Sequence, residues 1–239
     1  MEWTDEGVVL GAKSHGETNV VVELFTQDHG RHLGLLHGGQ SRKKVPTIQC
    51  GNLVNLTWKS RLSEQLGYLT LELKNCYSVQ AMEDPPALAA LSSLCSLLRL
   101  LPERDPHSIL YEVTVLFLSY LNDASVWPAV YVRWEVVLLQ ELGFGLDLSQ
   151  CASTGVTENL IYVSPKSGRA VSQSAGAPYH DRLLPLPSFL SQERSARLTK
   201  EDLSHGLALT GHFLETRILA ARGIQLPEAR GRILKFSNI

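Results

Sequence analysis

The sequence predicts an α+β protein with two domains, in which a small β-barrel over residues 1–80 precedes a mostly α-helical domain over residues 81–239. Three observations lead to this prediction. The first 80 residues hold five short segments that are rich in β-branched residues or alternate between polar and apolar, and glycine separates several of them. After Asp84-Pro85-Pro86, leucines recur at helical spacing. From about residue 147 to 187, many Ser, Gly and Pro residues interrupt the helical pattern and predict an irregular insertion.

The predicted strands lie in residues 7–12, 19–26, 31–37, 52–59 and 69–79. Gly16 and Gly30 stand where the first two connections turn, and Gly30 suits the positive φ of a hairpin. In the fourth strand Val54, Trp58 and the leucines do not all share a face, so the pattern does not fix one buried side. Five short strands suit a small Greek-key barrel such as an OB-fold, and the count alone leaves an SH3-like barrel open. Closure of the barrel would remove unpaired strand edges.

The helical domain is predicted from its start and stop signals. Asp84 is an N-cap before two prolines, and the helix that follows ends before Pro102. Further helices are predicted over residues 107–121, from 128 to a C-cap at Gly143, and from 199 to about 222. The last of these begins with the spacing of a capping box, Thr199 to Asp202, with Asp in place of Glu.

Composition excludes several classes of protein. The chain has 239 residues, of which 44% are hydrophobic and 19% charged, so it is not predicted to be disordered. Its apolar runs are too short to span a membrane, and Glu2, Asp5 and Glu6 stand where an export signal would be positive. The four cysteines are far apart in the sequence, which predicts reduced thiols and a cytoplasmic protein.

The distribution of charge is more informative than its total. With 22 basic and 24 acidic residues the net charge is −2, which by itself argues against a nucleic-acid-binding protein. However, residues 29–63 contain no Asp or Glu. We predict that the cations of this window form a DNA-binding surface: Arg31, Arg42, Lys43, Lys44, Lys59 and Arg61.

Binding by such a surface would be dominated by charge, weakly sequence-specific and steeply dependent on salt. Aromatic side chains that could stack on bases are few, namely Trp58, Tyr68 and Tyr77, and Trp58 equally fits the barrel core. A second basic set lies near the C-terminus, and the sequence leaves open whether it is a contact surface or a solvated helix face: Arg217, Arg222, Arg230, Arg232 and Lys235.

A phosphate-binding loop is not predicted. Residues 34–41 have its glycine and serine spacing, but Gln40 replaces the lysine that would reach the β- and γ-phosphates. The residues that follow lead to Pro46, which disfavours the required helix.

A metal site and a catalytic triad are not predicted either. Cys151 stands where a Cys-x-x-Cys pair would begin, but Thr154 takes the second position, and structural zinc needs four N or S ligands. Cys151, His180 and Asp181 have the atoms of a nucleophilic triad, but such residue types co-occur often, and only geometry defines a triad. No cofactor is therefore expected.

Several segments are more specific in combination than each is alone: residues 6–10 (EGVVL), 16–19 (GETN), 24–31 (LFTQDHGR), 133–145 (RWEVVLLQELGFG) and 162–171 (YVSPKSGRAV). Together they resemble the RecO family of bacterial recombination mediators, over essentially the whole chain. Some members of that family have a four-cysteine zinc site where this sequence keeps only Cys151.

The resemblance implies an N-terminal OB-fold, a helical C-terminal domain and a non-enzymatic role in recombinational DNA repair. It implies binding of single- and double-stranded DNA, annealing of complementary strands and, with RecR, loading of RecA onto DNA coated by single-stranded DNA-binding protein. The acidic, hydrophobic tail of that coating protein would dock on the helical domain, with Arg133 as a candidate contact and an intradomain ion pair as the alternative for that residue. A second reading of the sequence is a protein-interaction adaptor whose barrel binds a partner peptide and not DNA.

Overall fold

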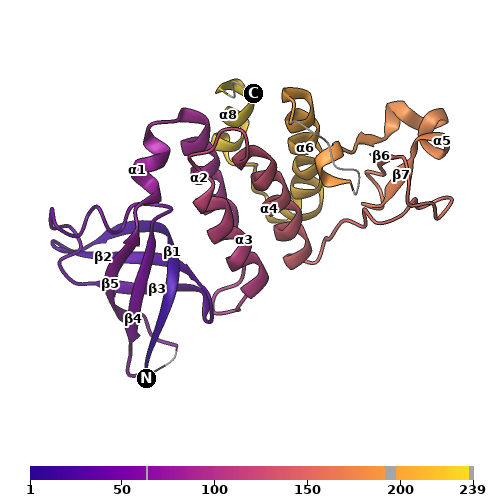
Figure 1. Ribbon diagram of the computed structural model, residues 1–239. Helices are drawn as coiled ribbons and strands as arrows, with labels where there is room; N and C mark the ends of the chain where they lie inside the picture. The colour runs from indigo at the N-terminus through magenta and orange to yellow at the C-terminus, as the bar shows by residue number, and fades with distance from the viewer. Residues whose placement is uncertain (63, 192–197, 237–239) are drawn as a thin grey trace. The chain divides into compact units, whose positions relative to one another are not determined.

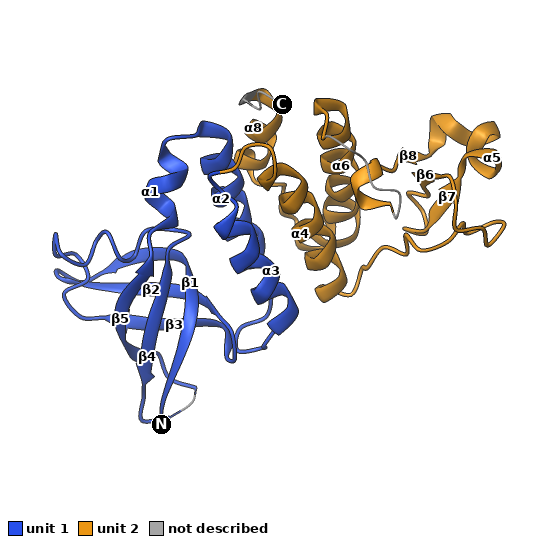
Figure 2. Ribbon diagram, in the orientation of Figure 1, with its two compact units in different colours: residues 1–122 blue, residues 123–239 orange. Residues whose placement is uncertain are grey.

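The computed structural model describes residues 1–62, 64–191 and 198–236. The chain divides into two compact units, Met1–Asn122 and Asp123–Ile239 (Figures 1 and 2). Unit 1 combines a β-barrel with helices, and unit 2 is largely helical with a small sheet. The predicted α+β fold class is therefore confirmed.

The barrel consists of β1 (Glu2–His15), β2 (Asn19–Thr26), β3 (Gly30–Leu36), β4 (Leu53–Lys59) and β5 (Gly67–Asn75). The strands close in the order β1-β2-β3-β5-β4, an OB-like ring. All neighbours are antiparallel except β3 and β5, which pair in parallel over only Gly34↔Gly67 and Leu35↔Tyr68. A short parallel pair thus completes the barrel.

The barrel core is formed by one face of each strand. In β4 this face carries Val54, Leu56 and Trp58, which are all in the core cluster. Trp58 is 2% exposed, and its indole N–H donates to the carbonyl of Leu33, so it does not serve as a stacking platform for bases. A Cβ atom on Gly67 would lie 2.2 Å from the Trp58 ring, and this close approach requires glycine.

The fifth predicted strand was wrong at its C-terminal end. β5 stops at Asn75, and α1 (Tyr77–Met82) follows where a strand to residue 79 was predicted. The buried amide of Asn52 explains the change, because its Oδ1 accepts from the backbone N–H of Ser78 at 3.0 Å. This contact joins residues 26 positions apart, so the local alternation could not reveal it.

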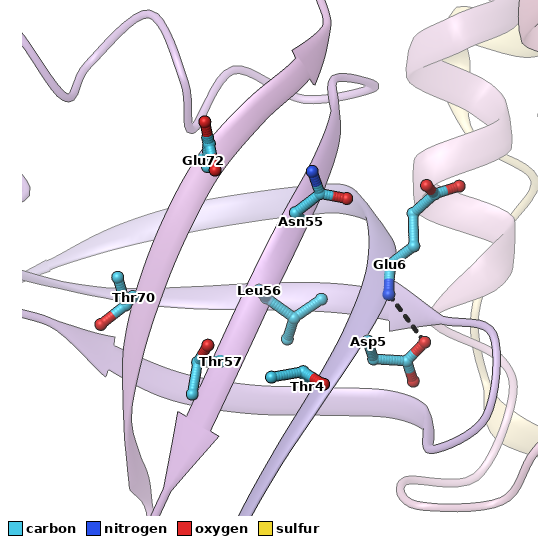
Figure 3. Close-up of a pocket in the computed structure, with 8 residues that line it drawn as sticks. All are labelled: Thr4, Asp5, Glu6, Asn55, Leu56, Thr57, Thr70 and Glu72. Atoms are coloured by element: carbon cyan, nitrogen blue, oxygen red, sulfur yellow. Dashed lines mark hydrogen bonds between the residues drawn. The ribbon is translucent and has the colours of Figure 1, made fainter.

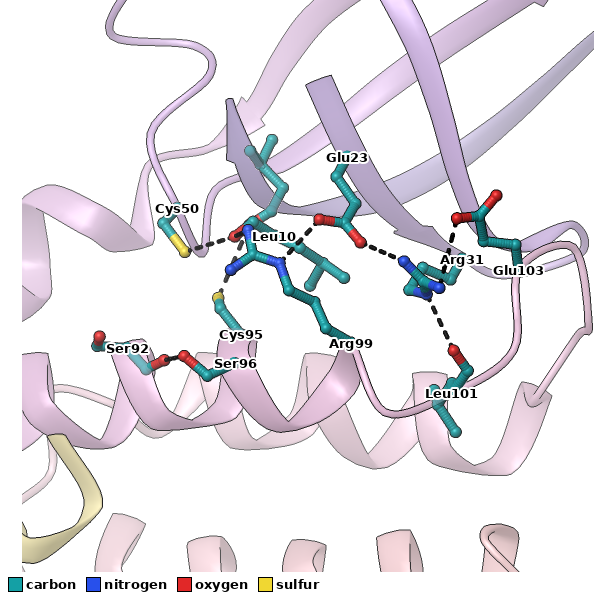
Figure 4. A network of polar contacts seen from close by, with 11 residues as sticks. Leu10, Glu23, Arg31, Cys50, Ser92, Cys95, Ser96, Arg99, Leu101 and Glu103 are labelled. Carbon is teal, nitrogen blue, oxygen red and sulfur yellow. Dashed lines mark hydrogen bonds and ion pairs between the residues drawn. The ribbon is translucent and has the colours of Figure 1, made fainter. Parts of the chain in front are cut away.

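Two further helices of unit 1, α2 (Pro85–Leu98) and α3 (Ser108–Ser119), begin and end close to their predicted positions. Arg99, at the end of α2, donates from Nε to Glu23 of β2 at 2.8 Å and from Nη2 to the carbonyl of Leu10 of β1 at 2.7 Å (Figure 4). These bonds fasten α2 to the barrel. The compact unit consequently continues to Asn122, beyond residue 80.

Unit 2 begins with α4 (Trp127–Glu141), which ends before Gly143 in the left-handed conformation expected of a helix end. The predicted irregular region holds a three-stranded sheet of β6 (Leu160–Val163), β7 (Ala170–Ser172) and β8 (Leu184–Pro185). Short helical turns accompany the sheet: α5 (Gln173–Gly176), η1 (Ala177–Arg182) and η2 (Ser188–Leu190). The region is therefore more regular than its composition indicated.

The C-terminal helical segment begins with the predicted capping box. The backbone N–H of Asp202 donates to Oγ1 of Thr199 at 3.1 Å, and the Thr199 N–H donates to the Asp202 carboxylate at 3.2 Å. The segment runs through α6 (Lys200–Phe213), the π-helical η3 (Leu214–Leu219) and α7 (Ala220–Arg222) to Gly223, and α8 (Glu228–Phe236) follows. None of the helices within the described residues is long and apolar enough to cross a membrane.

His32 of β3 lies in an aromatic cluster at the barrel wall. The rings of Trp3 and Trp58 meet it edge-on at 5.0 and 5.2 Å, and its Nε2 is buried without a hydrogen-bond partner among the described residues. Burial lowers the pKa of His32 below its usual value of 6.5, and the nearby Arg104 guanidinium adds to this effect. The folded barrel therefore favours a neutral His32.

We expect this group to make the chain less stable in mild acid. The unfolded chain protonates His32 near pH 6.5 while the folded chain resists protonation, so its contribution to stability is complete above that pH and is lost as the pH falls. Urea unfolding between about pH 7 and about pH 5 should show a smaller loss of unfolding free energy for His32→Phe than for the unmodified chain. Replacement of the exposed His180 by Phe is the control, and an equal loss in all three proteins would contradict the assignment.

Candidate nucleic-acid interface

Strand register brings two of the predicted cations together around an exposed tyrosine. Tyr68 of β5 pairs with Lys59 of β4 on one side and with Leu35 of β3 on the other. The ring of His37, just after β3, stacks on Tyr68 with centroids 4.9 Å apart and an interplanar angle of 18°. Arg61 lies two residues after Lys59, and both side chains line one cavity together with Tyr68. The end of β4 and the end of β3 thus meet at Tyr68.

The basic loop adjoins this place. Lys44 folds back so that its Nζ donates to the carbonyl of His37 at 2.6 Å, and Arg42 and Lys43 precede it in the same exposed connection. We use the name basic edge for Arg42, Lys43, Lys44, Lys59 and Arg61 together with His37 and Tyr68.

The cations of the basic edge are available to an anionic ligand. Arg42, Lys43 and Arg61 make no ion pair with any carboxylate in the part of the chain that the structure describes. Lys59 pairs with Glu2 at 2.9 Å, but both side chains are more than half exposed, and such surface pairs contribute about 0–1 kcal/mol. A phosphate can therefore replace Glu2 at Lys59 at little cost.

Arg31 does not lie at the basic edge. Its side chain is 16% exposed, its guanidinium lies between Glu23 at 2.5 Å and Glu103 at 3.5 Å, and its Nε donates to the carbonyl of Leu101 (Figure 4). Arg31 therefore holds β3 to the chain after α2. Its sequence position among acid-free residues gave no sign of these partners, because they come from β2 and from the connection between α2 and α3.

A cavity of about 650 Å³ opens at the basic edge. Its lining combines the two strand-end cations with apolar side chains and Tyr68. Tyr68 is 52% exposed and Leu66 is 47% exposed, whereas Tyr77, the other tyrosine proposed for stacking, is buried in α1. Only one of the three aromatic candidates from the sequence is thus positioned to meet a base.

A second cavity, of about 390 Å³, lies on the outer face of β1, β4 and β5 and has the opposite character (Figure 3). Two cross-strand rows line it, Thr4–Thr57–Thr70 and Glu6–Asn55–Glu72. Glu6 forms an ion pair with Lys74 and accepts a hydrogen bond from the hydroxyl of Tyr111. Carboxylates on this face disfavour phosphate, so they mark where the basic edge ends.

One member of the second basic set near the C-terminus, Arg230, does not lie on the surface. Arg230 is buried, with Nε 2.7 Å and Nη2 2.9 Å from the two oxygens of Glu135, and it also donates to the carbonyl of Leu207. Burial lowers the pKa of Arg230, but the Glu135 carboxylate outweighs burial and holds the pKa above its usual value. Arg217, Arg222, Arg232 and Lys235 are exposed, and Arg217 donates to the carbonyl of Lys166.

Arg133, the candidate contact for a partner tail, is exposed on α4. Its Nη2 donates to the carbonyl of Phe189 at 2.7 Å, and its guanidinium lies 5.8 Å from the centre of the Phe189 ring. Within the described residues, this side chain is therefore oriented by its own unit through a carbonyl and a ring.

Cys151 is buried beside β7, where its sulfur accepts from the backbone N–H of Ser172 at 3.3 Å. Burial raises the pKa of this thiol, but hydrogen bonds from Ser172 and Thr154 outweigh burial and lower the pKa to about 6. No group of three or more His, Cys, Asp or Glu residues suited to a metal ion occurs in residues 1–62, 64–191 and 198–236. His180, the other proposed triad member, is exposed and bonds to the carbonyl of Ala177.

Comparison with known proteins decides the family. The model of the family "Recombination protein O N terminal" matches residues 1–77, and that of "Recombination protein O C terminal" matches residues 82–223. A protein of Rhodospirillum centenum named DNA repair protein RecO is 51% identical over 237 residues, which are 98% of this chain and 94% of that protein. The chain belongs to the RecO family.

Two further RecO proteins show the same full-length similarity. DNA repair protein RecO of Methylobacterium nodulans is 50% identical over 96% of this chain and 95% of its own length, and that of Mesorhizobium japonicum is 46% identical over 98% and 92%. Membership of the RecO family confirms the resemblance predicted from the sequence motifs. It also makes the chain a non-enzymatic protein of recombinational DNA repair.

Proposed function

We propose that this RecO protein binds single- and double-stranded DNA at the basic edge and anneals complementary strands. We further propose that, together with RecR, it helps to load RecA onto DNA coated by single-stranded DNA-binding protein, whose acidic tail meets the helical unit near Arg133. The observation that carries DNA binding is the meeting of Lys44, Lys59 and Arg61 around Tyr68, because within the described residues these cations have no strong carboxylate partner.

The proposed mechanism is electrostatic. Two DNA strands repel each other through their phosphates, and cations placed between them reduce that repulsion. The loop cations lie on an exposed connection, so they can meet phosphates without a fixed register, while Lys59 and Arg61 are held at the end of β4. Annealing by this route forms and breaks no covalent bond.

Neutralising the loop tests this function. A variant with Arg42→Gln, Lys43→Gln and Lys44→Gln should bind a labelled oligonucleotide more weakly at low salt. If all three cations contact phosphates, the slope of log affinity against log salt should become shallower by about 2.7 on duplex DNA and about 2.1 on a single strand. In a strand-end variant with Lys59→Gln and Arg61→Gln, the same slope should become shallower by the amount expected for the loss of up to about two phosphate contacts.

The matched control removes two exposed lysines outside the basic edge, Lys74→Gln and Lys166→Gln, and should leave the slope unchanged. Equal slopes in the loop variant, the strand-end variant and the control would contradict the assignment. If the unmodified chain binds no oligonucleotide at either of two salt concentrations, the result would favour a protein-interaction adaptor whose barrel binds a partner peptide.

A further inference from the structure

The cavity at the basic edge has the size and lining of a site for one flat, apolar ring with an anionic substituent. Its volume, about 650 Å³, lies within the range of about 300–1,000 Å³ that small-molecule sites occupy. Met1, Leu66 and Tyr68 supply apolar surface, and Lys59 and Arg61 supply positive charge in the same lining. A nucleobase with its attached phosphate matches this combination.

Tyr68 is held in place before any ligand arrives. Its backbone is paired on both sides, to Leu35 of β3 and to Lys59 of β4. Its ring stacks on His37, whose carbonyl in turn accepts from Lys44. The ring nevertheless stays 52% exposed, so little conformational entropy would be lost when a base stacks against it.

We propose that this cavity takes one unstacked base of a single DNA strand, which stacks on Tyr68 while the flanking phosphates contact Lys59 and Arg61. This inference rests on the proposed DNA binding and adds a strand preference to it. A paired base would have to leave its helix to enter, at a cost of a few kcal/mol, so a duplex meets only the cations. Base stacking is tolerant of sequence because every base has a π-face.

The test compares two single strands of equal length and equal charge, one of thymidines and one in which every nucleotide is abasic. The unmodified chain should bind the thymidine strand more tightly, by about 5-fold to about 150-fold, because only that strand offers a base to Tyr68. Tyr68→Ala should remove this preference. Tyr68→Phe should keep the preference, and Tyr120→Ala, which removes another exposed tyrosine of unit 1, should also keep it.

Each outcome separates the base site from the proposed function. Equal affinity of the unmodified chain for both strands would overturn the base site and leave phosphate binding intact. A preference that survives in Tyr68→Ala would also overturn it, since the base would then be bound elsewhere. Failure of the unmodified chain to bind either strand would overturn both proposals together.

Discussion

An Arg230→Met variant should lose about 3–5 kcal/mol of unfolding free energy, because the substitution leaves the Glu135 carboxylate buried without its ion-pair partner. Glu135 is 0% exposed, and among the described residues the Thr210 hydroxyl also donates to it. Urea unfolding of the full chain, followed through a signal of unit 2, measures the loss. The variant should unfold at a clearly lower urea concentration.

Arg232 provides the matched control for this prediction. It lies on the same helix, α8, but is exposed, so Arg232→Met should change the unfolding free energy by no more than about 0.5 kcal/mol. The double variant Glu135→Leu, Arg230→Met removes both charges and should recover most of the loss. Thr210 stays satisfied in that variant because the single proton of its hydroxyl can be donated to the carbonyl of Gly206 in place of Glu135. Equal stability of Arg230→Met and Arg232→Met would show that the pair contributes nothing.

A Gly30→Ala variant should lose about 2–5 kcal/mol of unfolding free energy. Gly30 begins β3 with φ at +65°, where an L side chain is strained. An added Cβ would also lie 2.1 Å from the carbonyl oxygen of Asp105, so the backbone of the connection between α2 and α3 would have to move. The expected result is a lower midpoint in urea for unit 1.

Gly16 separates the two causes. It has the same φ of +65°, but nothing lies within 4 Å of the position of its Cβ. Gly16→Ala should therefore cost only the conformational strain, about 1–2 kcal/mol. If Gly30→Ala costs no more than Gly16→Ala, the contact with Asp105 does not constrain the barrel.

Local signals predicted much of the fold. β2 has the predicted bounds, the Asp84-Pro85-Pro86 signal begins α2, and the Thr199–Asp202 capping box begins α6. Each of these depends on residues a few positions apart. The end of β5 depended instead on a buried amide far away in sequence, and the pattern of residues 69–79 could not contain it.

The candidate site was predictable in composition but not in geometry. The absence of Asp and Glu from residues 29–63 located the cations. It could not show that Arg31 forms ion pairs with Glu23 and Glu103, or that Arg230 is buried in unit 2 by its ion pair with Glu135. Tyr68 was one of three aromatic candidates, and only the pairing of β5 between β3 and β4 distinguishes it from the buried Trp58 and Tyr77.

The short parallel pairing of β3 with β5 makes the proposed base site depend on completion of the barrel. His37 and Tyr68 are brought together only when β5 occupies its place between β3 and β4. A partly folded chain would therefore have the loop cations but not the stacked pair of His37 and Tyr68. A DNA strand lying across this junction would favour the closed form by mass action. If DNA binds at the basic edge as proposed, DNA binding and closure of the barrel are linked equilibria that share the pairing of β3 with β5.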